Sequence, residues 1–154
     1  MWDKVREQVQ TELDQLHQQF EVYDELLSKA GQGQPNPVEL SALAAFLHSF
    51  YNGVENIFKR IAIEIDNSRP VGEFWHQRLL SMVTEKTPDR MPVISAALAF
   101  RLKEYLQFRH FFRHAYTFQL DWERMKSLVQ GSGQTLRLLE EELAIFLRTG
   151  GAGN

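Results

Sequence analysis

Arginine, histidine and aromatic side chains alternate over residues 108–116 of the chain, in the segment FRHFFRHAY. Arg109 and Arg113 carry a permanent positive charge on a planar fork that fits phosphate oxygens. His110 and His114 can titrate near neutral pH, where histidine is the side chain most often used as a base. Because the whole chain has a net charge of −3, a cationic and aromatic-rich segment within it suggests a site for a phosphate-bearing ligand.

His110 and His114 are one helical turn apart, a spacing that could also hold a zinc ion. Arg109 and Arg113 would repel such a cation, and the glutamate expected beside the two ligands is absent. The chain has no cysteine, which excludes disulfides, thiolate nucleophiles, zinc–sulfur sites and iron–sulfur clusters. We therefore expect neither a metal nor a cofactor.

A structural interpretation of the same segment is also open. Six basic residues lie between Arg101 and Lys126 against three acidic ones, whereas residues 1–28 contain seven acidic residues and two basic ones. In this interpretation the phenylalanines of the segment belong to the core, and three arginines pair with the acidic N-terminal helix: Arg101, Arg109 and Arg113. Composition alone leaves both interpretations open.

Helical periodicity, rather than the alternation of a β-strand, runs through the whole sequence. Apolar residues recur in steps of three or four from Val5 to Leu27, and similar stripes follow. These stripes predict five helices, over about residues 3–29, 37–66, 75–83, from 92 through 112, and 121–149. Such helices joined by short loops predict an all-α fold, an up-and-down bundle of about five helices. We expect one domain over residues 1–149 and a disordered tail over 150–154.

Local signals support the predicted helix boundaries. Asn36 is a good N-cap, Pro37 suits the first helical position, and Glu39 occupies the capping-box position. Gly131 and Gly133 weaken the last helix by about 1 kcal/mol each relative to alanine. Because the apolar pattern continues across them, we expect a close helix crossing or a kink there rather than a break.

The sequence shows no sign of a membrane span or of a signal peptide. No apolar run approaches the roughly 20 residues of a membrane span, and the N-terminal MWDKVREQVQ lacks the apolar stretch of a signal peptide. With no cysteine in the chain, we expect a cytoplasmic protein without a membrane partner.

The spacing within the cationic segment is more specific than its composition. Arg109 is followed by His114 after four intervening residues and by Tyr116 two residues later, at the end of the fourth expected helix. This Arg-x4-His-x-Tyr arrangement resembles the HEPN superfamily and, within it, the HepT-like toxins. The polar His110 directly after the arginine, and the sequence FYNGVENIF over residues 50–58, are also similar to the family pattern.

The resemblance implies a metal-independent endoribonuclease toxin of a type II toxin–antitoxin system. Arg109 would hold the scissile phosphate, and His114 would act as base on the ribose 2′-hydroxyl or as acid to the leaving oxygen. His110 and Arg113 would support the site and bind RNA. Tyr116 matches the tyrosine that a partner nucleotidyltransferase, acting as antitoxin, modifies with AMP.

This resemblance covers about residues 5–148 and also implies a homodimer with both motifs facing a shared cleft. Helix geometry supports that expectation. In a continuous helix Tyr116 would lie about −20° from Arg109, whereas His114 would lie about 140° away. Either the helix unwinds near His114, which residues 117–120 would permit, or the site draws on two copies of the chain.

Several other residues have two interpretations each. Glu55 either orients Arg109 or His114, or is a solvated surface residue. Tyr51 and Trp122 either line the cleft or pack in the core. The remaining histidines lie among polar neighbours and are expected on solvated helix faces: His17, His48 and His76.

Two other functions remain possible for such a bundle. One is a non-catalytic helical subunit that serves as the docking partner or modification target of a nucleotidyltransferase. The other is a nucleotide-binding helical domain that uses the basic patch without needing His114. The presence of both Arg109 and His114 favours the enzyme, because a binding module needs no such pair.

Overall fold

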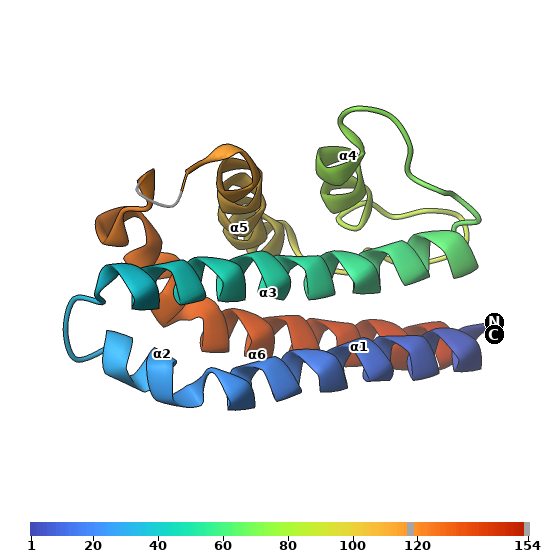
Figure 1. Cartoon of the computed structure of the whole chain (residues 1–154). Coiled ribbons are helices and arrows are strands. Elements are labelled where there is room, and N and C mark those ends of the chain that lie inside the picture. Colours follow the sequence, from blue (N-terminus) through green and yellow to red (C-terminus); the bar gives the residue numbers. More distant parts are fainter. Residues whose placement is uncertain (117–118, 153–154) are drawn as a thin grey trace.

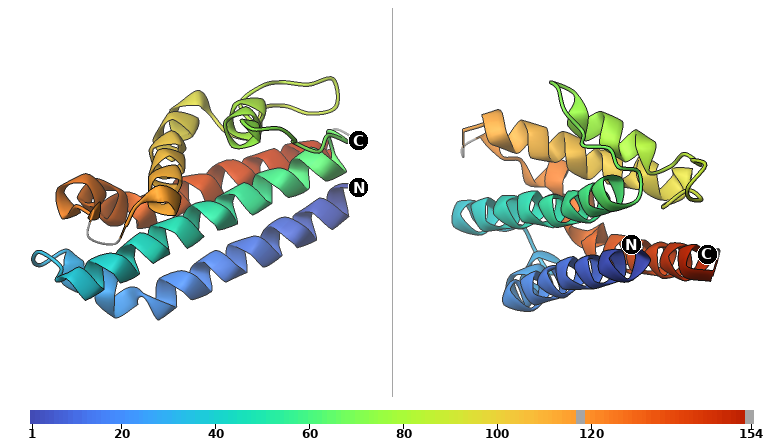
Figure 2. Two further views of the ribbon diagram at one scale, coloured as in Figure 1. Left: turned by 45° about the horizontal axis from the view of Figure 1, so that its top comes forward. Right: turned by 90° about the vertical axis from the view of Figure 1, so that its right-hand side faces the viewer.

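The structure is a computed structural model that describes residues 1–116 and 119–152, and these residues form the all-α fold that the sequence predicts. Six helices follow one another in this part of the chain: α1 (Trp2–Val22), α2 (Asp24–Ala30), α3 (Pro37–Glu64), α4 (Trp75–Met82), α5 (Ala96–His114) and α6 (Trp122–Ala152). The long helices α1, α3 and α6 lie side by side (Figure 1). α5 crosses α3 steeply on the side turned away from α1, and α4 lies on that same side (Figure 2).

The first expected helix is divided at Tyr23, so the described bundle has six helices rather than about five. Tyr23 leaves helical geometry with φ −96° and ψ 7°, and α2 starts at the next residue. Phe20 and Tyr23 both pack against Phe46 of α3, with ring centroids 5.1 and 5.3 Å away. Because the bend keeps the same face against α3, the apolar pattern continues through it and does not reveal it.

α3 is the central helix, and it begins where the sequence predicts. The Glu39 N–H donates to Oδ1 of Asn36 over 2.8 Å, while the Asn36 N–H donates to Oε1 of Glu39 over 2.9 Å. Pro37 follows at the start of the helix, which confirms the predicted capping box. α3 contributes much of the hydrophobic core through Leu43, Phe46, Leu47, Phe50, Val54, Ile57, Phe58 and Ile61.

The chain segments on either side of α4 are held by the buried guanidinium of Arg90. Its Nε–H and one Nη2–H donate to the two oxygens of Asp66 over 2.7 and 2.8 Å. Its other N–H groups donate to the backbone carbonyls of Met82, Glu85 and Met91. Arg90 therefore ties the second residue after the end of α3 to the connection that leads into α5.

α5 begins four residues after Pro92, which was expected to open it. The backbone N–H groups of residues 93 and 94 both donate to the carbonyl of Val83, so these residues belong to a turn. Ser95 is the actual N-cap, with its Oγ accepting a hydrogen bond from the helix. Glu142 of α6 accepts from the N–H and the hydroxyl of Ser95, which fixes the start of α5 on α6.

Some of the glycines lie where a side chain of a neighbouring helix comes close. A Cβ at Gly53 would lie 2.5 Å from Cδ2 of Leu16, so glycine lets α1 and α3 approach each other closely. A Cβ at Gly131 would lie 3.2 Å from Nη2, at the far end of the Arg101 side chain, and α6 continues through this position without a break, as expected. Gly133 has no such neighbour within 4 Å among the described residues.

α6 begins and ends close to the predicted boundaries. The side chain of Asp121 accepts from the N–H of Glu123 over 3.1 Å, as an N-terminal cap does. The helix continues to Ala152, beyond the predicted end at Thr149, and the last two residues of the expected tail lie outside the described residues. No helix in the described part of the chain is long and apolar enough to cross a membrane.

Candidate active site

Arg109 is held by α3 at one edge of its guanidinium and is open at the other. Its half-buried side chain leaves α5, and its Nε–H donates to Oδ1 of Asn52 over 2.7 Å. The four N–H groups on the two terminal nitrogens have no acceptor among the described residues. Neither terminal nitrogen is fully buried, so water reaches both. A planar cationic fork with unused donors is suited to bind a phosphate group.

His48 extends this arrangement along α3. Its Nε2 lies 3.3 Å from Nδ2 of Asn52, and its ring packs against Phe112 of α5 with centroids 5.3 Å apart. Burial lowers the pKa of His48, and the positive charges of Arg109 and Arg113 lower it further. The expectation of a solvated helix face is therefore wrong for His48, which is half-buried in the contact between α3 and α5.

Glu55 is buried, so the interpretation of a solvated surface residue is wrong. Its Oε2 accepts a hydrogen bond over 2.8 Å from Nδ1 of His76 on α4, rather than from Arg109. His76 is consequently part of the contact between α3 and α4 instead of a solvated face. Tyr51 and Trp122 are both buried and pack in the core. Burial, and then the charge of Glu55, raise the pKa of Tyr51, whereas Arg109 acts in the opposite direction.

His114 is the last residue of α5 and points away from Arg109. α5 is continuous up to His114, so the two side chains leave the helix about 140° apart around its axis. The backbone becomes extended only at Ala115, with φ −98° and ψ 149°. Unwinding therefore does not bring the imidazole of His114 toward Arg109 within one chain. A site shared between two copies stays a prediction.

Tyr116 lies beyond the end of α5, so the angle of about −20° from Arg109 does not apply to it. The residue as a whole is 71% exposed. Its backbone N–H donates to Oε1 of Gln119 over 2.7 Å, and its carbonyl accepts from the Gln119 N–H over 2.9 Å. The segment expected to unwind includes residues 117 and 118, which lie outside the described residues.

His110 and Arg113, the predicted supporting residues, are exposed on the last turns of α5. The ring of His110 contacts that of His114, with centroids 4.8 Å apart and planes 61° apart. Arg113 makes no ion pair with any residue that the structure describes. In residues 1–116 and 119–152, no three His, Asp or Glu side chains gather as metal ligands would.

The interpretation in which three arginines pair with the acidic N-terminal helix is wrong. Arg101 binds α6, where its Nε–H donates to Oγ1 of Thr135 over 2.6 Å and its Nη2 donates to the carbonyl of Gly131 over 3.1 Å. Arg109 is held by α3, and Arg113 projects into solvent. The cationic character of the end of α5 is therefore not neutralised by α1.

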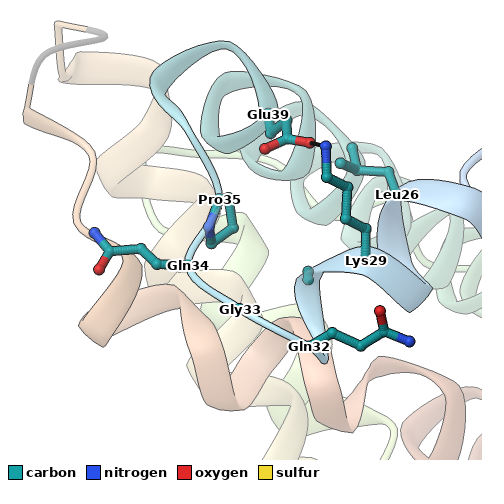
Figure 3. A pocket seen from close by; sticks show the side chains of 8 residues that line it. Leu26, Lys29, Gln32, Gly33, Gln34, Pro35 and Glu39 are labelled. Carbon is teal, nitrogen blue, oxygen red and sulfur yellow. Dashed lines mark ion pairs between the residues drawn. The ribbon is translucent and has the colours of Figure 1, made fainter.

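The hollow drawn in Figure 3 lies at the connection between α2 and α3 and has a volume of about 190 Å³. Its charged residues, Lys29 and Glu39, pair with each other over 2.6 Å. The hydrogen bond from Lys29, followed by that from the Asn36 N–H, lowers the pKa of Glu39. These groups serve the start of α3 and leave no charge in the hollow for a ligand.

Two larger hollows lie nearer to the cationic residues. One of about 510 Å³ lies between α1 and α3 and is bordered by Asn52 and Asn56. Another of about 430 Å³ lies between α5 and α6 and includes Phe108 and Phe111. Arg109 lines neither of these two hollows.

The sequence did not point to Asn52, which holds Arg109, and the expectation for His48, which contacts Asn52, was wrong. A signal was present, because His48, Asn52 and Asn56 recur every four residues on a helix that is otherwise mostly apolar. Polar residues in such a row share one helix face. His17, by contrast, keeps a half-exposed side chain on α1, where it pairs with Glu140 of α6.

A helical bundle with the Arg-x4-His-x-Tyr segment at the end of α5 defines a protein of the HEPN class. The profile of the HepT-like protein family matches residues 42–150, which include most of α3, all of α4 and α5, most of α6 and every predicted site residue. The chain belongs to the HepT-like family. No match was found among the curated proteins or among the solved structures.

Proposed function

We propose that the protein is a metal-independent endoribonuclease toxin of a type II toxin–antitoxin system, acting in the cytoplasm. The observation that carries this proposal is the open guanidinium of Arg109, which α3 anchors through one hydrogen bond to Asn52. Its unused donors face solvent at the cationic end of α5. Family membership supports the proposal, because His114 and Tyr116 accompany Arg109 at the spacing that resembles HepT-like toxins.

RNA supplies its own nucleophile, so the chemistry needs few protein groups. His114 takes the proton of a ribose 2′-hydroxyl, and the 2′-oxygen attacks the adjacent phosphorus. The bond from phosphorus to the 5′-oxygen breaks, that oxygen takes up a proton from water, and a 2′,3′-cyclic phosphate is left. Arg109 holds the non-bridging oxygens and stabilises their increased negative charge during the reaction. His110 and Arg113 add positive charge and donors for the neighbouring phosphates.

The complete site needs a homodimer. Because Arg109 and His114 point about 140° apart from one helix, a single chain does not direct both at one phosphate. In a two-fold dimer, Arg109 of one chain lies opposite His114 of the other across a shared cleft. Such a groove also concentrates the unpaired charge of Arg113 and its symmetry mate, which favours RNA over neutral ligands.

The proposed antitoxin is a nucleotidyltransferase that transfers AMP to Tyr116. The exposed phenol lies two residues after His114, at a place that a partner enzyme can reach. A nucleotide attached there is bulky and negative, so it would fill the cleft and repel the RNA backbone.

A non-catalytic docking subunit is the second candidate. The orientation of His114 away from Arg109 favours it, since one chain alone presents a cation without its base. The enzyme cleaves RNA without its partner and needs both Arg109 and His114 to do so. The docking subunit does not cleave RNA.

Cleavage of an oligoribonucleotide in EDTA by wild type, Arg109→Ala and His114→Ala tests the enzyme. We expect each variant to lose activity, by roughly 10²- to 10⁴-fold for the general base. His17→Ala, a half-exposed histidine on α1, is the matched control and should cleave normally. A substrate with 2′-deoxyribose at the cut site should resist. Equal cleavage by wild type and His114→Ala would refute the role of His114 as the base, and no cleavage by either would favour the docking subunit.

Mixing the two inactive variants tests the shared site. A heterodimer of Arg109→Ala and His114→Ala contains one site with both functional residues, so the mixture should recover about a quarter of wild-type activity. No recovery, in a mixture shown to exchange subunits, would contradict a site built from two chains. For Tyr116, intact-mass measurement after co-expression with the nucleotidyltransferase should show gains in multiples of AMP, which Tyr116→Phe abolishes.

A further inference from the structure

His48 belongs to a row of hydrogen bonds that ends on Arg109, and the direction of each bond follows from the chemistry of the groups. Arginine has no acceptor, so the atom of Asn52 that lies 2.7 Å from Nε of Arg109 is the carbonyl oxygen. The amide nitrogen of Asn52 then faces Nε2 of His48 over 3.3 Å. Because an amide nitrogen only donates, Nε2 of His48 accepts.

This direction fixes the protonation state of His48. An imidazole that accepts at Nε2 carries its hydrogen on Nδ1 and is neutral. Nδ1 is buried and has no partner among the described residues. A second proton, on Nε2, would point at the amide hydrogens of Asn52. The charged groups that reach the ring are Arg109 and Arg113 of α5, and both lower its pKa.

We propose that His48 is a positioning residue for Arg109, a role that rests on the proposed ribonuclease function. As a neutral acceptor it keeps the Asn52 amide turned with its oxygen toward α5, and the guanidinium is thereby held with its terminal nitrogens outward. His48 does not itself contact RNA, because Nε2 is occupied by Asn52 and Nδ1 is buried. Protonation of His48 removes the acceptor, releases the amide and loosens Arg109.

The protonation state can be measured without any activity. Nitrogen-15 NMR of the full-length protein at pH 7 should show the ring of His48 neutral with hydrogen on Nδ1. Asn52→Leu removes the donor and should abolish this tautomer preference. A ring with hydrogen on Nε2, or a doubly protonated ring at pH 7, would overturn the proposed positioning.

Two substitutions separate positioning from packing. His48→Gln places an oxygen near the position of Nε2 that accepts a hydrogen bond and does not titrate, so cleavage at pH 7 should stay close to wild type and decline less in acid. His48→Leu keeps an apolar side chain without an acceptor, so cleavage at pH 7 should fall about three- to tenfold, the equivalent of one neutral hydrogen bond. His17→Gln is the control and should reproduce the wild-type pH profile.

The outcomes distinguish this inference from the function on which it rests. Equal cleavage by His48→Gln and His48→Leu, with wild type active, would refute the positioning role and leave the ribonuclease standing. Absence of cleavage by wild type, with the Nδ1-protonated ring observed, would refute the ribonuclease and the positioning role while confirming the hydrogen-bonded row.

Discussion

Arg90 and Arg109 carry the same guanidinium, and the fold uses them in opposite ways. Every N–H group of Arg90 has an acceptor, from both oxygens of Asp66 and three backbone carbonyls, and its side chain is 1% exposed. Arg109 has one hydrogen bond to a described residue, through Nε to Asn52, and its terminal nitrogens reach solvent. Arg90 lies in the connections around α4, whereas Arg109 lies at the contact between α3 and α5.

The difference shows how a structure separates stabilising cations from binding cations. A buried charge is costly unless it is fully paired and hydrogen-bonded, which Arg90 is. A guanidinium that keeps free donors at a surface holds little of the fold together, yet it is ready to bind an anion. The state of the donors, rather than the residue type, therefore identifies the candidate binding arginine.

Replacing Arg90 should give the largest effect, and it should be on stability. Arg90→Ala leaves the carboxylate of Asp66 buried without its partner and strips three carbonyls of their donor. We expect the free energy of unfolding to fall by about 3–5 kcal/mol, measured by urea denaturation. Arg109→Ala is the matched control and should cost about 1 kcal/mol or less. Similar losses for both variants would contradict the comparison.

Replacing Arg109 should affect activity instead. In Arg109→Ala the phosphate loses the two-pronged guanidinium donor. RNA cleavage should therefore fall by roughly 10²- to 10³-fold, as for removal of a donor to a developing negative charge. Arg109→Lys keeps the charge without the two-pronged donor and should give an intermediate rate. Single-turnover cleavage by variants of confirmed helical content measures this, and an unimpaired Arg109→Ala would show that the open donors have no catalytic use.

Arg101 lies between these extremes and sharpens the comparison. Its partners on α6, Thr135 and Gly131, are neutral, and its side chain is half-buried. Arg101→Met keeps much of the aliphatic length and removes the hydrogen bonds, so the free energy of unfolding should fall by about 1–2 kcal/mol. Thermal or urea unfolding tests this. A loss as large as that of Arg90→Ala would mean that the charge of the partner matters little.

The smallest expected effect is a pH dependence from His48. Its pKa in the folded protein is lowered by burial and by the arginines of α5. The unfolded chain therefore binds this proton more readily, so stability falls as the pH drops below about 6.5. The loss levels off once the pH is below the folded-state pKa. His48→Gln should flatten this part of the curve of unfolding free energy against pH, and an unchanged curve would contradict the lowered pKa.

Much of the fold was predictable from local signals. The capping box of Asn36 and Glu39, the cap of Asp121 and the continuity of α6 through Gly131 depend on neighbouring residues or on an uninterrupted apolar stripe. The bend at Tyr23 and the late start of α5 after Pro92 were not predictable. Both depend on contacts with distant segments, namely the packing against Phe46 and the turn around the carbonyl of Val83.

For the candidate site, the sequence by itself determined the types and spacing of Arg109, His114 and Tyr116, and with them the family. Only the tertiary structure decided which arginine has all its donors paired within the fold and which keeps donors open, and that Asn52 accepts the hydrogen bond of the open one. A helical period states which residues share a face. It does not state which other helix packs on that face. That packing decides the hydrogen-bond partners and the burial of each charged side chain.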